Sequence, residues 1–237
     1  MLPLFWGEQQ AVVAFVAAAC IISSQSRSGI EAETRGNLGR YLVCMRGCRP
    51  LTQDEINRVL AAFDGPTATR ERAIFITALR TGMRISSILA LRIEDVAHEG
   101  KVRNRIRVRR ATVKGKRSGY DMALHAEAAA VLQEHIQTLK DTRPLAFVFP
   151  GRYRGTSLNR IRAWKVYRAA LAKAGIAGGR GELGMHTTRK TYAKRVFAAL
   201  GHDLVRTAYA LRHSCVSTTI RYISFDEEDV DRVILGL

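Results

Sequence analysis

Cysteine is scarce in this sequence of 237 residues, and its spacing is irregular. The four cysteines, Cys20, Cys44, Cys48 and Cys215, form no C-x-x-C pair and lack the density of a secreted disulfide scaffold. Cys44 and Cys48 can share a helix face, and His213 lies two residues before Cys215, but neither pattern completes a zinc ligand set. The sequence therefore favours a reduced, cytoplasmic protein, and we expect no metal site.

Long hydrophobic runs are also lacking. The run from Ala11 to Ile22 is wholly apolar, but its 12 residues fall short of the roughly 20 that cross a bilayer as a helix. Only Glu8 is charged before this run, whereas a signal peptide needs a basic start. We expect no membrane association, and interpret the run as a helix that packs on the body or on a partner. The Ser-rich stretch 23–29 is typical of a linker.

Acidic residues are few relative to basic ones. The chain has 21 Asp and Glu against 38 Lys and Arg, a formal charge of +17. Residues 1–47 hold four Arg and three Glu, so +1 of this charge lies there and +16 lies in residues 48–237. We therefore divide the chain into an N-terminal extension, 1–47, and a main domain, 48–237. An excess of this size predicts a polyanionic partner, with nucleic acid as the first candidate.

The main domain shows mostly helical patterns. Thr52 with Glu55 three residues later is a capping box that starts a helix. Gly82 separates two further helical runs and places Arg84 at their junction. The other helical patterns cover 126–139, 158–174, 187–200, 204–211 and 216–222.

A basic hairpin interrupts the helices. Arginine occupies the odd positions Arg103, Arg105, Arg107 and Arg109, and Ile106 and Val108 alternate with them, which predicts a strand with one basic face. Residues 114–119 are rich in turn formers, and 120–124 can return as the partner strand. The predicted fold is therefore α+β and mainly α-helical, with a small antiparallel sheet.

Two pairs of residues suggest phosphate chemistry. His186 and Arg189 share one face at the start of a helix, an end that attracts phosphate. His213 and Tyr222 lie nine residues apart and bracket a short helical run. Taken singly, such a histidine is more often structural and such a tyrosine more often a core aromatic.

The order of motifs resembles the catalytic domain of the tyrosine recombinases, or phage integrases, from Pro50 to about Ile234. T-G-M-R-I-S at 81–86 is similar to the family's first arginine box, and H-T-T-R at 186–189 to its H-x-x-R box. L-R-H at 211–213 and T-I-R-Y at 219–222 are similar to its L-G-H and T-x-x-Y endings. Each box alone is a weak signal, whereas four boxes in order are specific.

The resemblance implies a site-specific recombinase that cuts and rejoins DNA through a 3′-phosphotyrosine, without metal or cofactor. Tyr222 would be the nucleophile, Arg84 and Arg189 the phosphate clamps, and His213 a further donor. His186 would handle the tyrosine proton. Lys114 would be the general acid for the 5′ oxygen, and Lys116 is the alternative because the hairpin alignment can slip by two residues. We expect DNA contacts from the remaining basic residues of this region: Arg103, Arg105, Arg107, Arg109, Lys116, Arg117 and Arg212.

The resemblance also implies partners and a location. Double-stranded DNA would be the substrate, bound by a homotetramer in the cytoplasm at the nucleoid, with accessory DNA-bending proteins as possible partners. A type IB topoisomerase-like enzyme, which uses similar chemistry, is a further interpretation.

Several residues depart from the family pattern. Ser87 stands where a glutamate commonly supports the first arginine, Thr188 replaces a leucine, and Arg212 replaces the glycine before His213. Residues 1–47 are too few and too apolar for the family's core-binding domain, which predicts weak, salt-sensitive DNA binding. These departures keep open a second interpretation, a catalytically impaired DNA-binding remnant or accessory protein of a mobile element.

Overall fold

The computed structural model describes residues 48–112, 118–179, 181–213, 215–220, 222–223 and 234–236. These residues all belong to one compact unit, Arg46–Leu237. The predictions for residues 1–47 and for Lys114, Lys116 and Arg117 lie outside the described residues. Within the described part, no helix is long and apolar enough to cross a membrane.

The first helix of the body begins as its sequence predicts. In α3 (Gln53–Ala62), the Thr52 side chain accepts the Glu55 N–H, and the Glu55 carboxylate accepts the Thr52 N–H at 2.9 Å. Arg49 donates to the same carboxylate, and this bond holds the pKa of Glu55 down at about 2. The N-terminus of α3 is therefore satisfied by side chains, and α3 packs against α8 (Arg160–Lys173).

Helix α4 (Ala68–Thr81) is the central element of the core. It packs against both α7 (Ala126–Gln137) and α9 (Thr187–Ala199), and it ends at Gly82 in the left-handed conformation, with φ of 60°. The largest hydrophobic cluster joins buried side chains of α3, α4, α7 and α8, among them Val59, Leu79 and Leu132. Each such side chain stabilises the fold by about 1.5–3 kcal/mol.

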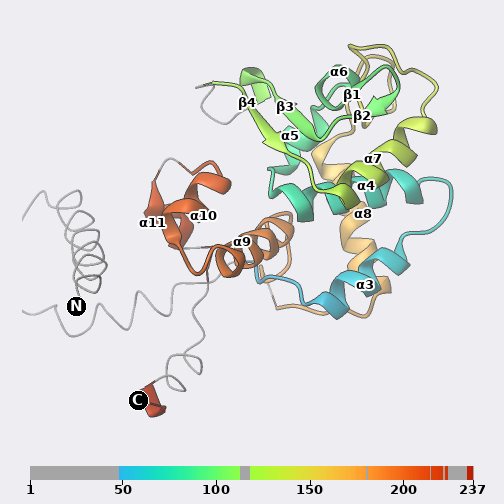
Figure 1. Ribbon diagram of the computed structural model, residues 1–237. Helices are drawn as coiled ribbons and strands as arrows, with labels where there is room; N and C mark the ends of the chain where they lie inside the picture. The colour runs from blue at the N-terminus through green and yellow to red at the C-terminus, as the bar shows by residue number, and fades with distance from the viewer. Residues whose placement is uncertain are drawn as a thin grey trace, which may run out of the picture. The chain divides into compact units, whose positions relative to one another are not determined.

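Two short helices follow α4, and two small antiparallel sheets follow those helices (Figure 1). Helix α5 (Ile85–Leu89) follows its N-cap Arg84, which lies at the predicted junction with α4, and α6 (Ile93–Val96) leads into β1 (Ala97–His98) and β2 (Lys101–Val102). The predicted basic hairpin is present as β3 (Arg105–Val108) paired with β4 (Tyr120–Ala123), with Val108 opposite Tyr120. Between them lies the 3-10 turn η1 (Arg110–Thr112).

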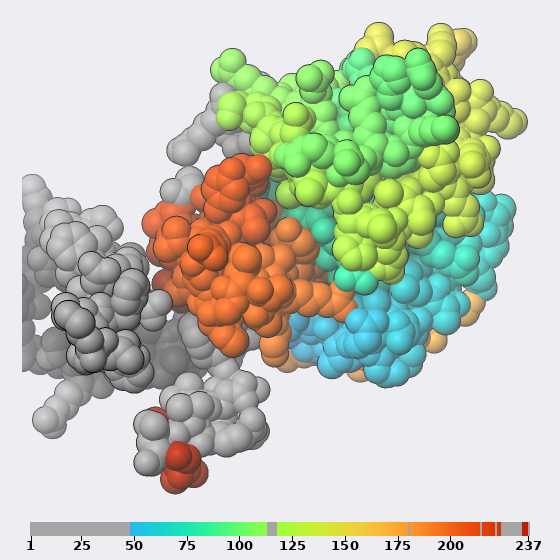
Figure 2. All heavy atoms as spheres, viewed as in Figure 1, coloured from blue at the N-terminus to red at the C-terminus, as the bar shows by residue number. Residues whose placement is uncertain are grey.

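The C-terminal helices gather at one end of α9 (Figure 1). Helix α10 (Leu204–Ala210) begins with Asp203, whose carboxylate accepts the Arg206 N–H, and α11 (Val216–Ile220) packs against it. The corner between them is formed by Leu211, Arg212 and His213. In the space-filling view, the atoms of α10 and α11 border those of the β3–β4 hairpin (Figure 2).

Candidate active site

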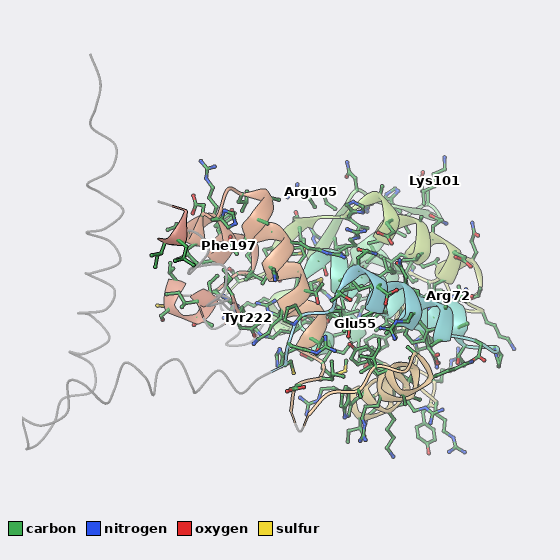
Figure 3. All side chains as sticks on the ribbon, turned by 90° about the horizontal axis from the view of Figure 1, so that it is seen from below. Glu55, Arg72, Lys101, Arg105, Phe197 and Tyr222 are labelled. Carbon is green, nitrogen blue, oxygen red and sulfur yellow. The ribbon has the colours of Figure 1, made fainter. Side chains whose placement is uncertain are left out.

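Tyr222 lies just after α11, where its N–H donates to the carbonyl of Thr219 at 2.8 Å (Figure 3). Its ring centroid is 5.0 Å from that of His213 and 6.5 Å from that of His186. The guanidinium carbon of Arg189 lies 5.7 Å from the same centroid. The structure thus brings together four of the predicted site residues, which come from α9, from the corner after α10 and from the end of α11.

Arg189 is the most deeply buried cation of the site, at 4% exposure. Its guanidinium donates to the carbonyl of Gly82 at the end of α4 and, at 2.7 Å, to the carbonyl of Leu211 after α10. Burial lowers its pKa, and the nearby charge of Arg84 lowers it further, yet a guanidinium remains charged in such surroundings. Two helix ends therefore hold one fixed positive charge at the centre of the site.

Gly82 is required for this arrangement. Its φ of 60° is strained for any residue with a side chain, and an added Cβ would meet the ring of Tyr192 on α9. Glycine therefore lets α4 end, lets α9 approach and presents a carbonyl to Arg189.

His213 is held as a neutral ring. Its Nδ1 lies 2.8 Å from the hydroxyl oxygen of the fully buried Thr219, and its Nε2 is buried without a hydrogen-bond partner in the described part. Burial lowers the pKa of His213 to about 4, and the charges of Arg189 and Arg84 contribute. When Thr219 donates to Nδ1, the ring proton lies on Nε2, which is then a donor available to a ligand.

Arg84 and His186 border a hollow beside these residues. The hollow has a volume of about 420 Å³, and its lining includes Arg84, His186 and Arg189 together with Arg160 and Trp164 of α8. His186 is exposed and stands at the N-cap of α9, where its ring meets Tyr222 edge-on at 81°. The hollow is therefore lined by three guanidinium groups, and two of its lining residues, His186 and Arg189, also lie beside the Tyr222 ring.

The described residues on either side of segment 113–117, which includes Lys114, lie near this cluster. Before it, the hydroxyl of the buried Ser87 donates to the carbonyl of Thr112 at 2.9 Å, only three residues along the chain from Arg84. After it, Tyr120 lies near Arg189, Arg212 and Arg84: burial raises its pKa, and these three charges oppose that rise. Ser87 thus holds the carbonyl of Thr112, the last described residue before segment 113–117.

The arginines of the hairpin do not share one face. Arg105 and Arg107 are exposed on β3, and Arg103 is exposed just before the strand. Arg109 differs from the prediction because β3 ends at Val108. Its guanidinium lies 3.0 Å from the carboxylate of Asp95 and donates to the carbonyl of Ala90 at 2.7 Å.

Asp95 explains why Arg109 turns inward. It is 1% exposed, and burial raises its pKa, whereas its bond from the Arg92 N–H and the charge of Arg109 lower it. A buried carboxylate requires such a partner, so the partly exposed Arg109 turns toward Asp95 instead of continuing the exposed face of Arg105 and Arg107.

Three residues of the site were not predicted as functional: Thr219, Arg160 and Trp164. Thr219 is the threonine of the T-x-x-Y box, so its position was visible, but its bond to His213 depends on the corner between α10 and α11. Arg160 and Trp164 carry no motif and reach the hollow only through the packing of α8. In the described ranges, no group of three or more His, Cys, Asp or Glu residues could hold a metal ion.

Comparisons with known proteins identify the family of the chain. The model of the phage integrase family matches residues 49–229. The probable integrase/recombinase YoeC of Bacillus subtilis is 28% identical over 159 residues, covering 67% of this chain and 80% of YoeC. Tyrosine recombinase XerD of Mycobacterium tuberculosis is 28% identical over 183 residues, covering 73% of this chain and 56% of XerD. The chain thus spans only a little over half the length of XerD.

Solved structures show the same fold. The crystal structure of XerA recombinase superposes with a TM-score of 0.62 at 21% identity, covering 80% of this chain and 65% of XerA. XerH site-specific recombinase bound to its palindromic difH substrate also gives 0.62 at 21% identity, over 78% of this chain and 51% of XerH. An integrase of transposon Tn1549 in complex with circular intermediate DNA gives 0.56 at 19% identity, over 79% of this chain and 66% of the integrase. By its family match, its motif order and its fold, the chain belongs to the phage integrase family of tyrosine recombinases.

Proposed function

We propose that this chain is an active DNA strand-transfer enzyme whose nucleophile is Tyr222. The observation that carries the proposal is the convergence of the Tyr222 ring with His213, His186 and the buried Arg189. A phosphodiester needs cations for the charge that grows on its non-bridging oxygens, and a fixed, partly dehydrated guanidinium supplies this without reorganisation.

In the proposed reaction, the phenolic oxygen of Tyr222 attacks the phosphorus of the scissile phosphate in duplex DNA. The bond from phosphorus to the 5′ oxygen breaks, and a 3′-phosphotyrosine forms. His186 receives the phenolic proton, directly or through water, and Lys114 protonates the departing 5′ oxygen. Arg84, Arg189 and the Nε2–H of His213 bind the non-bridging oxygens. A 5′ hydroxyl from a second strand then reverses the step and releases the tyrosine.

The wider DNA surface is proposed from the exposed arginines Arg103, Arg105 and Arg107, with Lys116 and Arg117 in the adjacent segment. The tetramer on DNA and the accessory DNA-bending proteins are proposed on the family resemblance alone. Sedimentation of the protein with a duplex that has two binding sites tests the tetramer. We expect one species with two protomers on one DNA, and a heavier species in which two such complexes have paired.

The test of the nucleophile uses nicked duplexes from the ends of the surrounding genetic element. After cleavage, the short fragment between the cleavage site and the nick, which carries the free 5′ hydroxyl, diffuses away. The covalent protein–DNA adduct then survives denaturant. We expect an adduct with the wild type and none with Tyr222→Phe, although both bind DNA. Tyr153→Phe is the matched control, since Tyr153 is 72% exposed and lies outside the site.

A second candidate, a protein that binds DNA without cutting it, is favoured by Ser87 and Arg212, which depart from the family pattern beside the site. Binding by the wild type without any adduct, under conditions where a family relative cleaves, would support this candidate and overturn the first. Relaxation of supercoiled DNA that needs no paired sites would instead indicate topoisomerase-like activity.

A further inference from the structure

Arg212 adopts a backbone conformation that normally belongs to glycine. Its φ is +53°, in the corner that joins α10 to α11, directly before His213. A side chain in the left-handed region costs roughly 1 kcal/mol or more relative to glycine. The contacts of the Arg212 side chain can offset this cost.

The guanidinium of Arg212 lies over two aromatic rings. The Arg212 guanidinium carbon lies 4.8 Å from the ring centroid of Tyr120 on β4 and 4.6 Å from that of Tyr209 on α10. Both distances are within the roughly 6 Å at which a cation is attracted to a ring face. The guanidinium also lies 3.5 Å from the carbonyl oxygen of Asp121 on β4.

The stack joins two parts of the proposed site that come from distant parts of the chain. Tyr120 begins the strand that follows segment 113–117, which carries the proposed acid Lys114. Tyr209 and Arg212 lead directly into His213, whose Nε2 is buried and has no hydrogen-bond partner among the described residues. Arg212 is exposed, and its planar guanidinium lies over both rings, so it can connect the strand of Tyr120 to the helix of Tyr209.

We infer that Arg212 is a positioning residue, which locks the β3–β4 hairpin onto the His213 corner through Tyr120 and Tyr209. The effect of Arg212 on cleavage rests on the proposed function, whereas the contact of Arg212 with the two tyrosine rings does not. It replaces the phosphate contact expected from the sequence. It also explains why Tyr209, 70% exposed on α10, is an aromatic residue rather than a polar one.

The experiment compares the rate of adduct formation at saturating DNA with the affinity for DNA as a function of salt. Tyr209→Leu removes one ring without changing any charge, and we expect cleavage to fall roughly tenfold while affinity and its salt dependence stay unchanged. Arg212→Lys keeps the charge but loses the planar stack, and should show the same pattern. Tyr209→Phe keeps the ring and should cleave at close to the wild-type rate.

Two further variants separate positioning from general damage. Arg212→Gly removes the contact with the two rings, so the cleavage rate should fall. It also removes the backbone strain, so the thermal midpoint of unfolding should not fall. Tyr153→Leu is the matched control: Tyr153 is equally exposed and also lies 5.9 Å from an arginine, Arg152, but away from the site. It should cleave like the wild type.

The opposite results would overturn the assignment. If Arg212 contacts a phosphate, Arg212→Lys keeps most of the activity, Tyr209→Leu has no effect, and Arg212→Gly weakens binding and lowers the salt slope by about one. Hydrogen exchange reports on the contact without any activity. Faster exchange of residues 105–108 and 120–123 in Arg212→Gly supports the lock even if the wild type proves unable to cleave, and unchanged exchange refutes it.

Discussion

The hydroxyl oxygen of Thr219 lies 2.8 Å from Nδ1 of His213, and when this hydroxyl donates to Nδ1 the ring proton lies on Nε2. Replacing Thr219 by Val keeps the shape of the side chain but removes this donor, so the proton can move to Nδ1 and Nε2 loses its hydrogen. We expect cleavage at saturating DNA to fall roughly tenfold, the worth of one buried hydrogen bond. Thr219→Ser keeps the hydroxyl and should cleave at close to the wild-type rate; equal losses in both variants would contradict the assigned role.

The stability of the fold should decrease in mild acid, in part because of His213. Its pKa is lowered in the folded protein to about 4, from an ordinary value near 6.5. The unfolded chain therefore binds the proton more readily, and stability is lost as pH falls from about 6.5 toward 4. Glu55 acts only at lower pH, because its folded pKa is about 2.

Urea unfolding at pH 7 and pH 5 measures this effect. His213→Gln should reduce the difference between the two midpoints without removing it, because burial also lowers the pKa of His135. An unchanged difference in the variant would show that His213 is not neutral in the fold.

Gly82→Ala should harm both stability and cleavage. The left-handed backbone costs about 1 kcal/mol, and the new methyl group would also displace the ring of Tyr192 and the carbonyl that binds Arg189. Gly65→Ala is the matched control, since Gly65 has a φ of +74° but no atom within 4 Å of an added Cβ. A thermal midpoint lowered equally by both substitutions would show that only the backbone conformation matters at Gly82.

Arg109 and Arg107 should behave in opposite ways although only Val108 separates them. Arg109→Met leaves the carboxylate of Asp95 buried without its ion pair, so unfolding free energy should fall by about 3 kcal/mol while the salt slope of DNA binding stays constant. Arg107→Met, on the exposed face of β3, should leave stability within roughly 0.5 kcal/mol and lower the salt slope by about one. Denaturant titration and binding at several salt concentrations distinguish these patterns, and equal salt slopes in the two variants would refute the separation.

Ser87→Ala should weaken the proposed acid step because it frees the start of the segment that carries Lys114. A substrate whose leaving 5′ oxygen is replaced by sulfur needs no protonation, so it should be cleaved by Ser87→Ala and by Lys114→Ala at close to the wild-type rate. Slow cleavage of the sulfur substrate by Ser87→Ala would indicate instead that Ser87 acts on Arg84.

The elements that were predictable from the sequence are those fixed by neighbours along the chain. The capping box of Thr52 and Glu55, the stop at Gly82 and the alternation in β3 are local, and the structure confirms them. The two-residue strands β1 and β2 were missed, since Glu99 and Gly100 turn the chain through positive φ values without a recognisable hydrophobic pattern.

The failures concern partners that the fold brings from elsewhere. The alternation of arginines suggested that Arg109 lies on the basic face, but a buried carboxylate fourteen residues earlier, Asp95, sets its direction. Similarly, the sequence showed that Arg212 replaces a glycine, whereas its two aromatic neighbours follow only from the packing of β4 beside α10. Motif order predicts the candidate reacting residues because chemistry constrains them, whereas their supporting contacts are set by packing.

Arg189 is held by two carbonyl oxygens, and in the part of the chain that the structure describes no carboxylate forms an ion pair with it. Among the described residues this interior charge has no carboxylate partner, and a phosphate of the DNA would supply a counter-ion. Thermodynamic linkage then ties occupancy to folding, because a ligand that binds only the folded state adds stability in proportion to the logarithm of its concentration. The same guanidinium that would bind the reacting phosphate would therefore make the DNA-bound enzyme harder to unfold than the free one.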